Sequence, residues 1–188
     1  MRGLSEYGDM EGIAWEWQSI DGSMNKAPLA QESSGRNPTD RGKKGTKRHI
    51  LMDERGVPLL IVVTGANRHD VSQLKAVLNN KIVESFMAVG PENLCADAGY
   101  AGEVPRETIT AAGYEPHVCP RDVEKEEKAQ NPCFKARRWV VGACHSWFNR
   151  FRKLVIRYEK LDSTHLALTH LAAAIIALCK VRTRIIYG

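Results

Sequence analysis

Apolar residues in the C-terminal third of the chain recur with the period of a helix. Between Arg137 and Lys160 they stand three or four residues apart, at Val140, Cys144, Trp147, Phe151, Leu154 and Tyr158. This spacing places one apolar stripe along one side of an α-helix. The other side carries Arg138, Gly142, His145, Asn149 and Arg152. We therefore predict one long helix with a buried face and an exposed, basic face.

Shorter patterns predict strands in the first half of the chain. Alternation over Trp15–Asp21 predicts a strand. Two apolar, β-branched runs between His49 and Gly65 are separated by Asp53-Glu54-Arg55-Gly56, which predicts a β-hairpin with a type I turn and a bulge. Residues 26–47 are rich in Gly, Pro, Ser, Asn and Lys and predict a long loop.

The remaining pattern alternates between helix and strand. Asp70, with Gln73 three residues on, predicts the N-cap of a helix over about 71–84. Further strands are expected over 93–97 and 114–119, helices over 104–112 and 164–182, and an exposed loop over 121–133. This order predicts an α/β domain with a mixed sheet and packed helices, preceded by a loose lead-in at 1–14 and followed by a tail at 183–188.

The charge is concentrated in two segments. Net charge is +5, but residues 36–56 hold seven Lys or Arg against three acids, and residues 134–160 hold eight against one. Two basic segments favour a phosphate-rich partner, although a solvated face is the simpler interpretation of a charge run alone.

Cysteine usage and hydropathy bound the compartment. The five cysteines form no CxxC pair, which is typical of a reduced, cytosolic protein; zinc binding by His117 and Cys119 is a minor alternative. The most apolar stretch, 166–179, is shorter than the roughly 20 residues that span a bilayer, so we expect a buried core helix and no membrane.

Two aspartates follow predicted strands. Asp21 ends the first, and Asp97 ends a later one before a glycine-rich turn. Carboxylates at strand ends beside a basic face suit Mg²⁺, which is completed by water and substrate phosphates. Aspartate is also common at turns for structural reasons alone, so spacing leaves both interpretations open.

Five stretches carry a family resemblance: SIDGS, NPTDRGKKGTKRHILMDERGVPL, VTGANRHD, LCADAGY and RRWVVGACHSWFNRFRKLVIRYEK. They resemble the catalytic domain of bacterial insertion-sequence DDE transposases, in the branch around insertion sequence five, and they span 15–182. The resemblance implies an RNase H-like mixed sheet with an antiparallel start and flanking helices. It also implies that Asp21 and Asp97 are the first two catalytic acids and hold Mg²⁺ or Mn²⁺, with two ions in an intact site.

The implied reaction is phosphodiester hydrolysis at transposon ends, followed by attack of the freed 3′-hydroxyl on target DNA. The implied partners are both DNAs and further copies of the chain assembled on DNA, and the implied location is the cytoplasm, at the nucleoid. From the basic loop, the helix and the matching motif we expect DNA contacts from Arg41, Lys43, Lys44, Lys47, Arg48, Arg138, His145, Asn149, Arg150 and Arg152.

Two departures from the family pattern shape the expectation of activity. Gly142 stands where the family has its third acid, a glutamate, and the usual helical N-terminal region is missing, as in a truncated copy. We expect weak metal binding with strand transfer absent or severely reduced. The alternatives are a non-catalytic DNA-binding remnant, an imidazole of His145 in place of the acid, and a nuclease of the same fold class.

Overall fold

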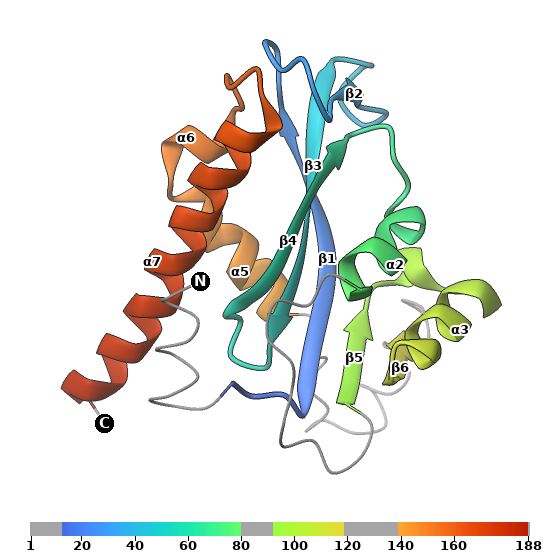
Figure 1. Ribbon diagram of the computed structural model, residues 1–188, viewed down its shortest axis with the longest axis vertical. Coiled ribbons are helices and arrows are strands. Elements are labelled where there is room, and N and C mark those ends of the chain that lie inside the picture. The colour runs from blue at the N-terminus through green and yellow to red at the C-terminus, as the bar shows by residue number, and fades with distance from the viewer. Residues whose placement is uncertain (1–12, 80–91, 119–138, 188) are drawn as a thin grey trace.

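The computed structural model describes residues 13–79, 92–118 and 139–187, and its centre is a six-stranded mixed sheet (Figure 1). The strands are β1 (Trp17–Lys26), β2 (Gly35–Arg36), β3 (Lys44–Asp53), β4 (Pro58–Gly65), β5 (Glu92–Ala96) and β6 (Tyr114–Val118). Their order is β2-β3-β1-β5-β6, with β4 also paired to β3. β3 is antiparallel to β1 and β4, whereas β1, β5 and β6 are parallel.

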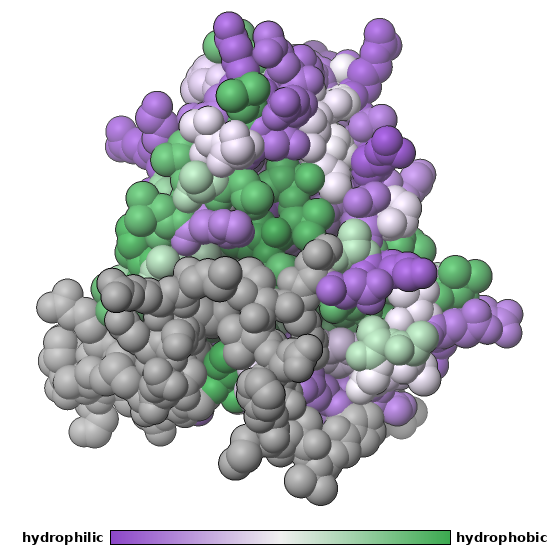
Figure 2. Space-filling model, in the orientation of Figure 1, coloured by the Kyte–Doolittle hydropathy of each residue, from purple (hydrophilic) through white to green (hydrophobic). Residues whose placement is uncertain are grey.

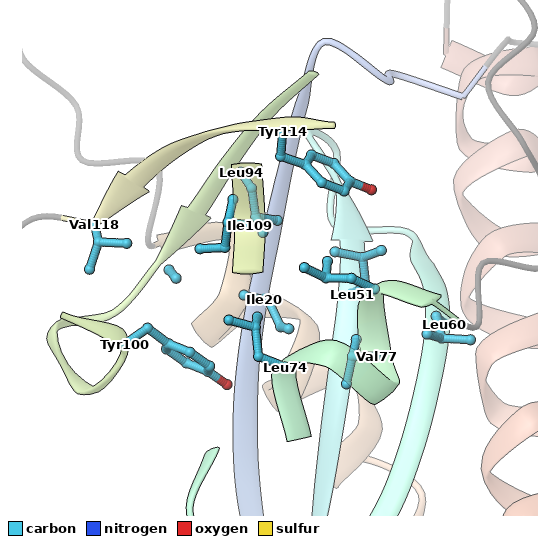
Figure 3. Close-up of a cluster of buried hydrophobic side chains, with 12 residues drawn as sticks. Ile20, Leu51, Leu60, Leu74, Val77, Leu94, Tyr100, Ile109, Tyr114 and Val118 are labelled. Carbon is cyan, nitrogen blue, oxygen red and sulfur yellow. The ribbon is translucent and has the colours of Figure 1, made fainter. Parts of the chain in front are cut away.

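Helices cover both faces of this sheet (Figure 1). One face packs against α2 (Asp70–Asn79) and α3 (Glu103–Ala111) through a cluster that includes Ile20, Leu51, Leu74, Leu94, Ile109 and Tyr114 (Figure 3). The other packs against α5 (Trp139–Asn149), α6 (Arg152–Val155) and α7 (Asp162–Tyr187) through Ile50, Met52, Ile61, Cys144, Phe148, Leu154 and Ile176. Alternate residues of β3 therefore pack into different cores, Leu51 into the first and Ile50 and Met52 into the second, as strand geometry requires.

The predicted fold class is confirmed. The hairpin of β3 and β4 turns where expected, with the Gly56 N–H donating to the carbonyl of Asp53 at 3.0 Å and Gly56 at φ +80°. A register shift between Leu51 and Met52 supplies the bulge. A mixed sheet that starts antiparallel and is flanked by helices is the arrangement expected of an RNase H-like domain.

The prediction of a single long helix over 137–160 was wrong. α5 ends at Asn149, Phe151 is extended, and only the short α6 follows. The next residues pair with the far end of β1: Ile156 bridges Lys26, and the Arg157 N–H donates to the Lys26 carbonyl at 2.8 Å. No Gly or Pro marks the break in the sequence. The helix ends because the following residues pair with β1, which overrides the helical period. Tyr158, placed on the apolar stripe by that period, is exposed instead.

Two further local predictions were wrong. β1 does not stop at Asp21 but continues to Lys26, and β3 begins at Lys44, so part of the predicted loop is strand. Asp70 does not cap α2, because it is the first residue of that helix and its carboxylate turns toward Lys47 and His49. The predicted loop over 121–133 lies outside the described residues.

α7 is the longest helix in the described part of the chain. Over Asp162–Lys180 it is long and apolar enough to cross a membrane by length and composition, which a core helix of a soluble protein also satisfies. Ala172, Ile176 and Ala177 are buried in the domain, while Leu171 and Leu178 lie on its outer side. Figure 2 shows the corresponding apolar surface.

Phe148 joins the second core to a buried charge, which makes it a sensitive probe of this packing. It is fully buried, and the guanidinium carbon of Arg48 lies 4.4 Å from its ring centroid. We expect Phe148→Ala to lower the free energy of unfolding by about 3–5 kcal/mol, measured by urea denaturation. Val155→Ala, at a half-exposed site, is the control, and equal losses in both variants would contradict this packing.

Candidate active site

The register of two parallel strands brings Asp21 and Asp97 together. Ile20 of β1 is paired with Ala96 of β5, and each aspartate is the next residue of its chain. Neighbouring strands are about 4.8 Å apart. The two carboxylates therefore start from adjacent positions at the end of the β1–β5 ladder.

Both aspartates are anchored by local backbone donors. The Gly22 N–H donates to Asp21 Oδ1 at 2.7 Å, and the Gly99 N–H donates to Asp97 Oδ1 at 2.8 Å. Asp97 is the N-cap of the short 3₁₀ turn Ala98–Tyr100. Each carboxylate keeps its second oxygen for another partner.

An unpaired edge of β1 begins at these aspartates. β5 pairs with β1 only from Trp17 to Ile20, whereas β3 accompanies the other edge of β1 as far as Lys26. Within the described residues, no strand lies along the β5 side of β1 from Asp21 until Ile156 bridges Lys26. Side chains from both faces of the sheet can reach this open stretch.

From the α5 face, His145 approaches Asp21. Its Nε2 lies 3.5 Å from Asp21 Oδ2, and the ring is buried. Neither ring nitrogen has a hydrogen-bond partner among the described residues. The prediction that His145 belongs to the exposed basic face was wrong in its placement, because α5 turns this residue toward the end of β1.

Gly142, one turn before His145, leaves the third-acid position open. The residue is exposed, and a Cβ built on it would meet no atom within 4 Å in the described structure. A side chain can therefore start from this position without its Cβ meeting a described neighbour.

From the α2 face, Asp70 reaches the same stretch of β1. Its Oδ2 lies 3.2 Å from the Nζ of Lys47, and its Oδ1 lies 3.4 Å from the Nδ1 of His49. A Cβ at Gly22 would overlap Oδ1 of Asp70, so the approach depends on glycine following Asp21. Sequence position left a catalytic role for Asp70 as the weaker alternative, because an aspartate between strand and helix usually predicts a cap.

Tyr100 lies beneath the three carboxylates. Its ring is turned toward Ile20 and Leu74 (Figure 3), and its hydroxyl has no hydrogen-bond partner among the described residues. Burial raises the pKa of the Tyr100 phenol above its ordinary value, and the charges of Asp70, Asp21 and Asp97 raise it further. The pKa of the Tyr100 phenol is therefore raised by the charges of all three acids.

The donor set suits a hydrated divalent cation rather than a closed protein cage. In the described ranges no three His, Cys, Asp or Glu side chains are grouped closely enough to enclose a metal ion. Mg²⁺ is typically held by one or two carboxylates, with water and substrate phosphates completing its shell. Asp21 and Asp97, with unpaired nitrogens of His145 beside them, fit that mode.

The predicted DNA contacts divide by exposure. The prediction that Lys47 and Arg48 contact DNA was wrong, since both side chains are buried. Lys47 pairs with Asp70. Arg48 packs on Phe148, and burial lowers its pKa to about 10. Arg138 lies outside the described residues. His145 is buried beside Asp21. The remaining predicted contacts are exposed, namely Arg41, Lys43, Lys44, Asn149, Arg150 and Arg152. Figure 2 shows hydrophilic residues over the end of the molecule around β2.

Comparison with known proteins covers most of the chain. Residues 16–177 match the family model described as "Transposase DDE domain". A Burkholderia cepacia protein named "Putative transposase for insertion sequence element IS402" is 34% identical over 147 residues, which cover 76% of this chain and 67% of that protein.

Solved structures give a much lower similarity. The catalytic domain of Mos1 mariner transposase has a TM-score of 0.38 and 10% identity, over 95% of this chain and 88% of that one. The Mos1 mariner paired-end complex with Mn has a TM-score of 0.37 and 13% identity, over 95% and 59%.

The buried imidazole of His49 gives the site a pH dependence. Burial and, to a smaller extent, Lys47 lower the pKa of His49 to about 4, against the opposing pull of Asp70. The unfolded chain, with an ordinary histidine pKa near 6.5, therefore takes up a proton that the folded chain refuses as pH falls from about 6.5 to 4. We expect this to cost about 2 kcal/mol of unfolding free energy between pH 7 and pH 5.

The measurement is urea denaturation at both pH values for the native chain and His49→Gln. Glutamine keeps a donor and an acceptor for Thr64, whose hydroxyl is 2.9 Å from His49 Nε2, but it does not titrate. The variant should lose less stability on acidification. Identical pH dependence in both proteins would contradict a neutral, buried His49.

Proposed function

Because the chain belongs to the DDE transposase family, we propose that it is a catalytic domain that hydrolyses phosphodiester bonds at transposon ends and transfers the freed strand to target DNA. The observation that carries the proposal is the register of Ile20 opposite Ala96, which starts Asp21 and Asp97 from adjacent positions at the end of the β1–β5 ladder. The family match over residues 16–177 supports the reaction class.

Asp21 and Asp97 would hold the divalent cation, Mg²⁺ or Mn²⁺, with two ions expected in an intact site. When bound, such ions activate the attacking oxygen and stabilise the leaving oxygen of a phosphodiester. The nucleophile is water in the first step and a DNA 3′-hydroxyl in the second, so no side chain becomes covalently linked to DNA. Gly22 and Gly99 orient the two carboxylates through their N–H groups.

DNA would be held by the exposed basic groups at two places. Arg41 and Lys43 lie between β2 and β3 and Lys44 begins β3, whereas Asn149, Arg150 and Arg152 lie where α5 ends and α6 begins. Arg138 joins them by the family motif. We place the protein in the cytoplasm, at the nucleoid, and expect copies to associate on DNA.

Gly142 is the feature that favours a second candidate, a DNA-binding remnant without catalysis. With glycine in place of a carboxylate at position 142 of α5, the site has lost one charge that would face the reacting phosphate. The same openness offers a direct test, because the Cβ of a glutamate at this position would meet no atom of the described structure within 4 Å.

We expect Gly142→Glu to raise metal-dependent strand cleavage by about a hundredfold or more, the loss typical when one electrostatic group is missing. Cleavage of a transposon-end duplex is measured with Mg²⁺ and with Mn²⁺. Gly142→Gln is the matched control, equal in size but uncharged, and Gly142→Glu combined with Asp97→Asn should be inactive. Equal cleavage by the native chain and all three variants would contradict the proposed site.

DNA affinity should fall steeply with salt. Each phosphate contact contributes about 0.9 to the slope of log K against log salt concentration, because bound counterions are released. Removing both lysines in Lys43→Ala/Lys44→Ala should therefore reduce the slope by about 2, as measured by fluorescence anisotropy. Lys75→Ala, an exposed lysine on α2, is the control. A flat salt response, or equal slopes in the two variants, would contradict this interface.

A further inference from the structure

Asp70 approaches the same open edge of β1 as the two predicted catalytic acids, but from the other face of the sheet. Asp21 is paired across the ladder with Ile50, whose side chain lies in the α5 and α7 core. Gly22, the next residue, faces α2, where the Asp70 carboxylate fills the space that a side chain would occupy. Beyond Ile20 no strand of the described structure separates the two faces at this edge.

Unpaired polar atoms gather around this one strand end. Within the described residues, four buried atoms there make no hydrogen bond: Asp70 Oδ1, His49 Nδ1, Tyr100 Oη and His145 Nε2. Asp70 Oδ1 and His49 Nδ1 lie 3.4 Å apart, and His145 Nε2 lies 3.5 Å from Asp21 Oδ2, so these are contacts without hydrogen-bond geometry. Buried polar groups are nearly always paired with protein or ordered water. The rings of His49, Tyr100 and His145 are more than nine-tenths buried, and the Nε2 of His145 points at Asp21. Polar groups at this edge therefore have unused capacity to bind a hydrated cation or water.

A positive charge already stands beside Asp70. The ammonium of Lys47 lies 3.2 Å from Asp70 Oδ2 and donates to the Arg68 carbonyl at 3.0 Å, while its side chain is only 6% exposed. Asp70 itself is 34% exposed, so its other side is open to solvent. The carboxylate is thus held in place by a buried cation and can still be approached by a hydrated ion.

We propose that Asp70 is a third carboxylate of the metal site and holds the hydrated divalent cation of Asp21 and Asp97 through the water shell of that ion. The inference rests on the proposed function, since it adds a residue to the same site. Binding through water follows from the spacing, because no three acidic or imidazole groups of the described chain enclose an ion directly. Mg²⁺ loses its water reluctantly and is commonly held in this way.

Asp70 does not replace the acid missing at Gly142. Gly142 is on α5, on the opposite face of the sheet, where the phosphate of a bound DNA strand would need a carboxylate beside His145. Asp70 is expected to maintain metal affinity, whereas the Gly142 position governs turnover. Substitutions at Asp70 should therefore change metal affinity, whereas substitutions at Gly142 should change the rate of cleavage.

The experiment measures Mn²⁺ affinity of the full chain without DNA, from the electron paramagnetic resonance signal of free Mn²⁺ during titration. Asp70→Asn should weaken binding by about 10- to 100-fold, the usual effect of removing a group that acts on a metal from its outer shell. Asp162→Asn is the matched control. Asp162 is also the first residue of a helix, is 34% exposed, and pairs with a buried cation, Arg157, at 2.7 Å.

Two further variants separate the possible outcomes. Asp97→Asn tests the proposed function: unchanged Mn²⁺ affinity there would contradict metal binding by the two strand-end acids. Loss in Asp97→Asn with native affinity in Asp70→Asn would overturn the inference alone. Lys47→Met leaves Asp70 in place and removes its competing cation, so Mn²⁺ affinity should rise several-fold. No rise in a folded Lys47→Met protein would mean that Asp70 serves only the ion pair.

Discussion

The site depends on one mismatch in strand length. β1 runs for six residues beyond its last partner on β5, and Asp21 is the first of them. The parallel pairing of Ile20 with Ala96 fixes where that free edge begins and which two carboxylates flank it. A longer β5 would cover the edge, and a one-residue slip would turn Asp21 into the other core. The geometry of the acids is therefore a consequence of sheet register, which the two hydrophobic cores hold from both sides.

Three cationic side chains are buried within the fold, and two of them pair with an acid. Lys47 faces Asp70, Arg48 lies against Phe148, and Arg157 bonds to Asp162. These side chains are too buried to meet DNA, so they organise the domain instead. The exposed basic groups are left for phosphate, at the β2–β3 connection and at the end of α5. The basic residues counted in the sequence thus fall into a buried group, which stabilises the domain, and an exposed group, which is available to DNA.

The sequence predicted the features that depend on local pattern and order. Alternation and turn residues located β3 and β4. The family resemblance singled out Asp21 and Asp97, which their positions in the sequence left open. Features that depend on distant contacts were missed. The break after Asn149 comes from pairing between Arg157 and Lys26, and the role of Asp70 comes from Lys47, His49 and the missing side chain of Gly22. Charge alone could not separate buried Lys47 and Arg48 from exposed Lys43 and Lys44. β3 is buried along its whole length after Lys44, so burial depends on where the packing elements begin to cover the strand.

The central claim is that the free edge of β1 binds a divalent cation between its two strand-end aspartates. The most direct measurement is an anomalous difference map from crystals of the full chain grown with Mn²⁺. The account predicts a peak beside the carboxylates of Asp21 and Asp97, on the side from which Asp70 approaches, and no peak there in Asp97→Asn crystals. Fully ordered aspartates without a peak at saturating Mn²⁺, or a peak unaffected by Asp97→Asn, would contradict it.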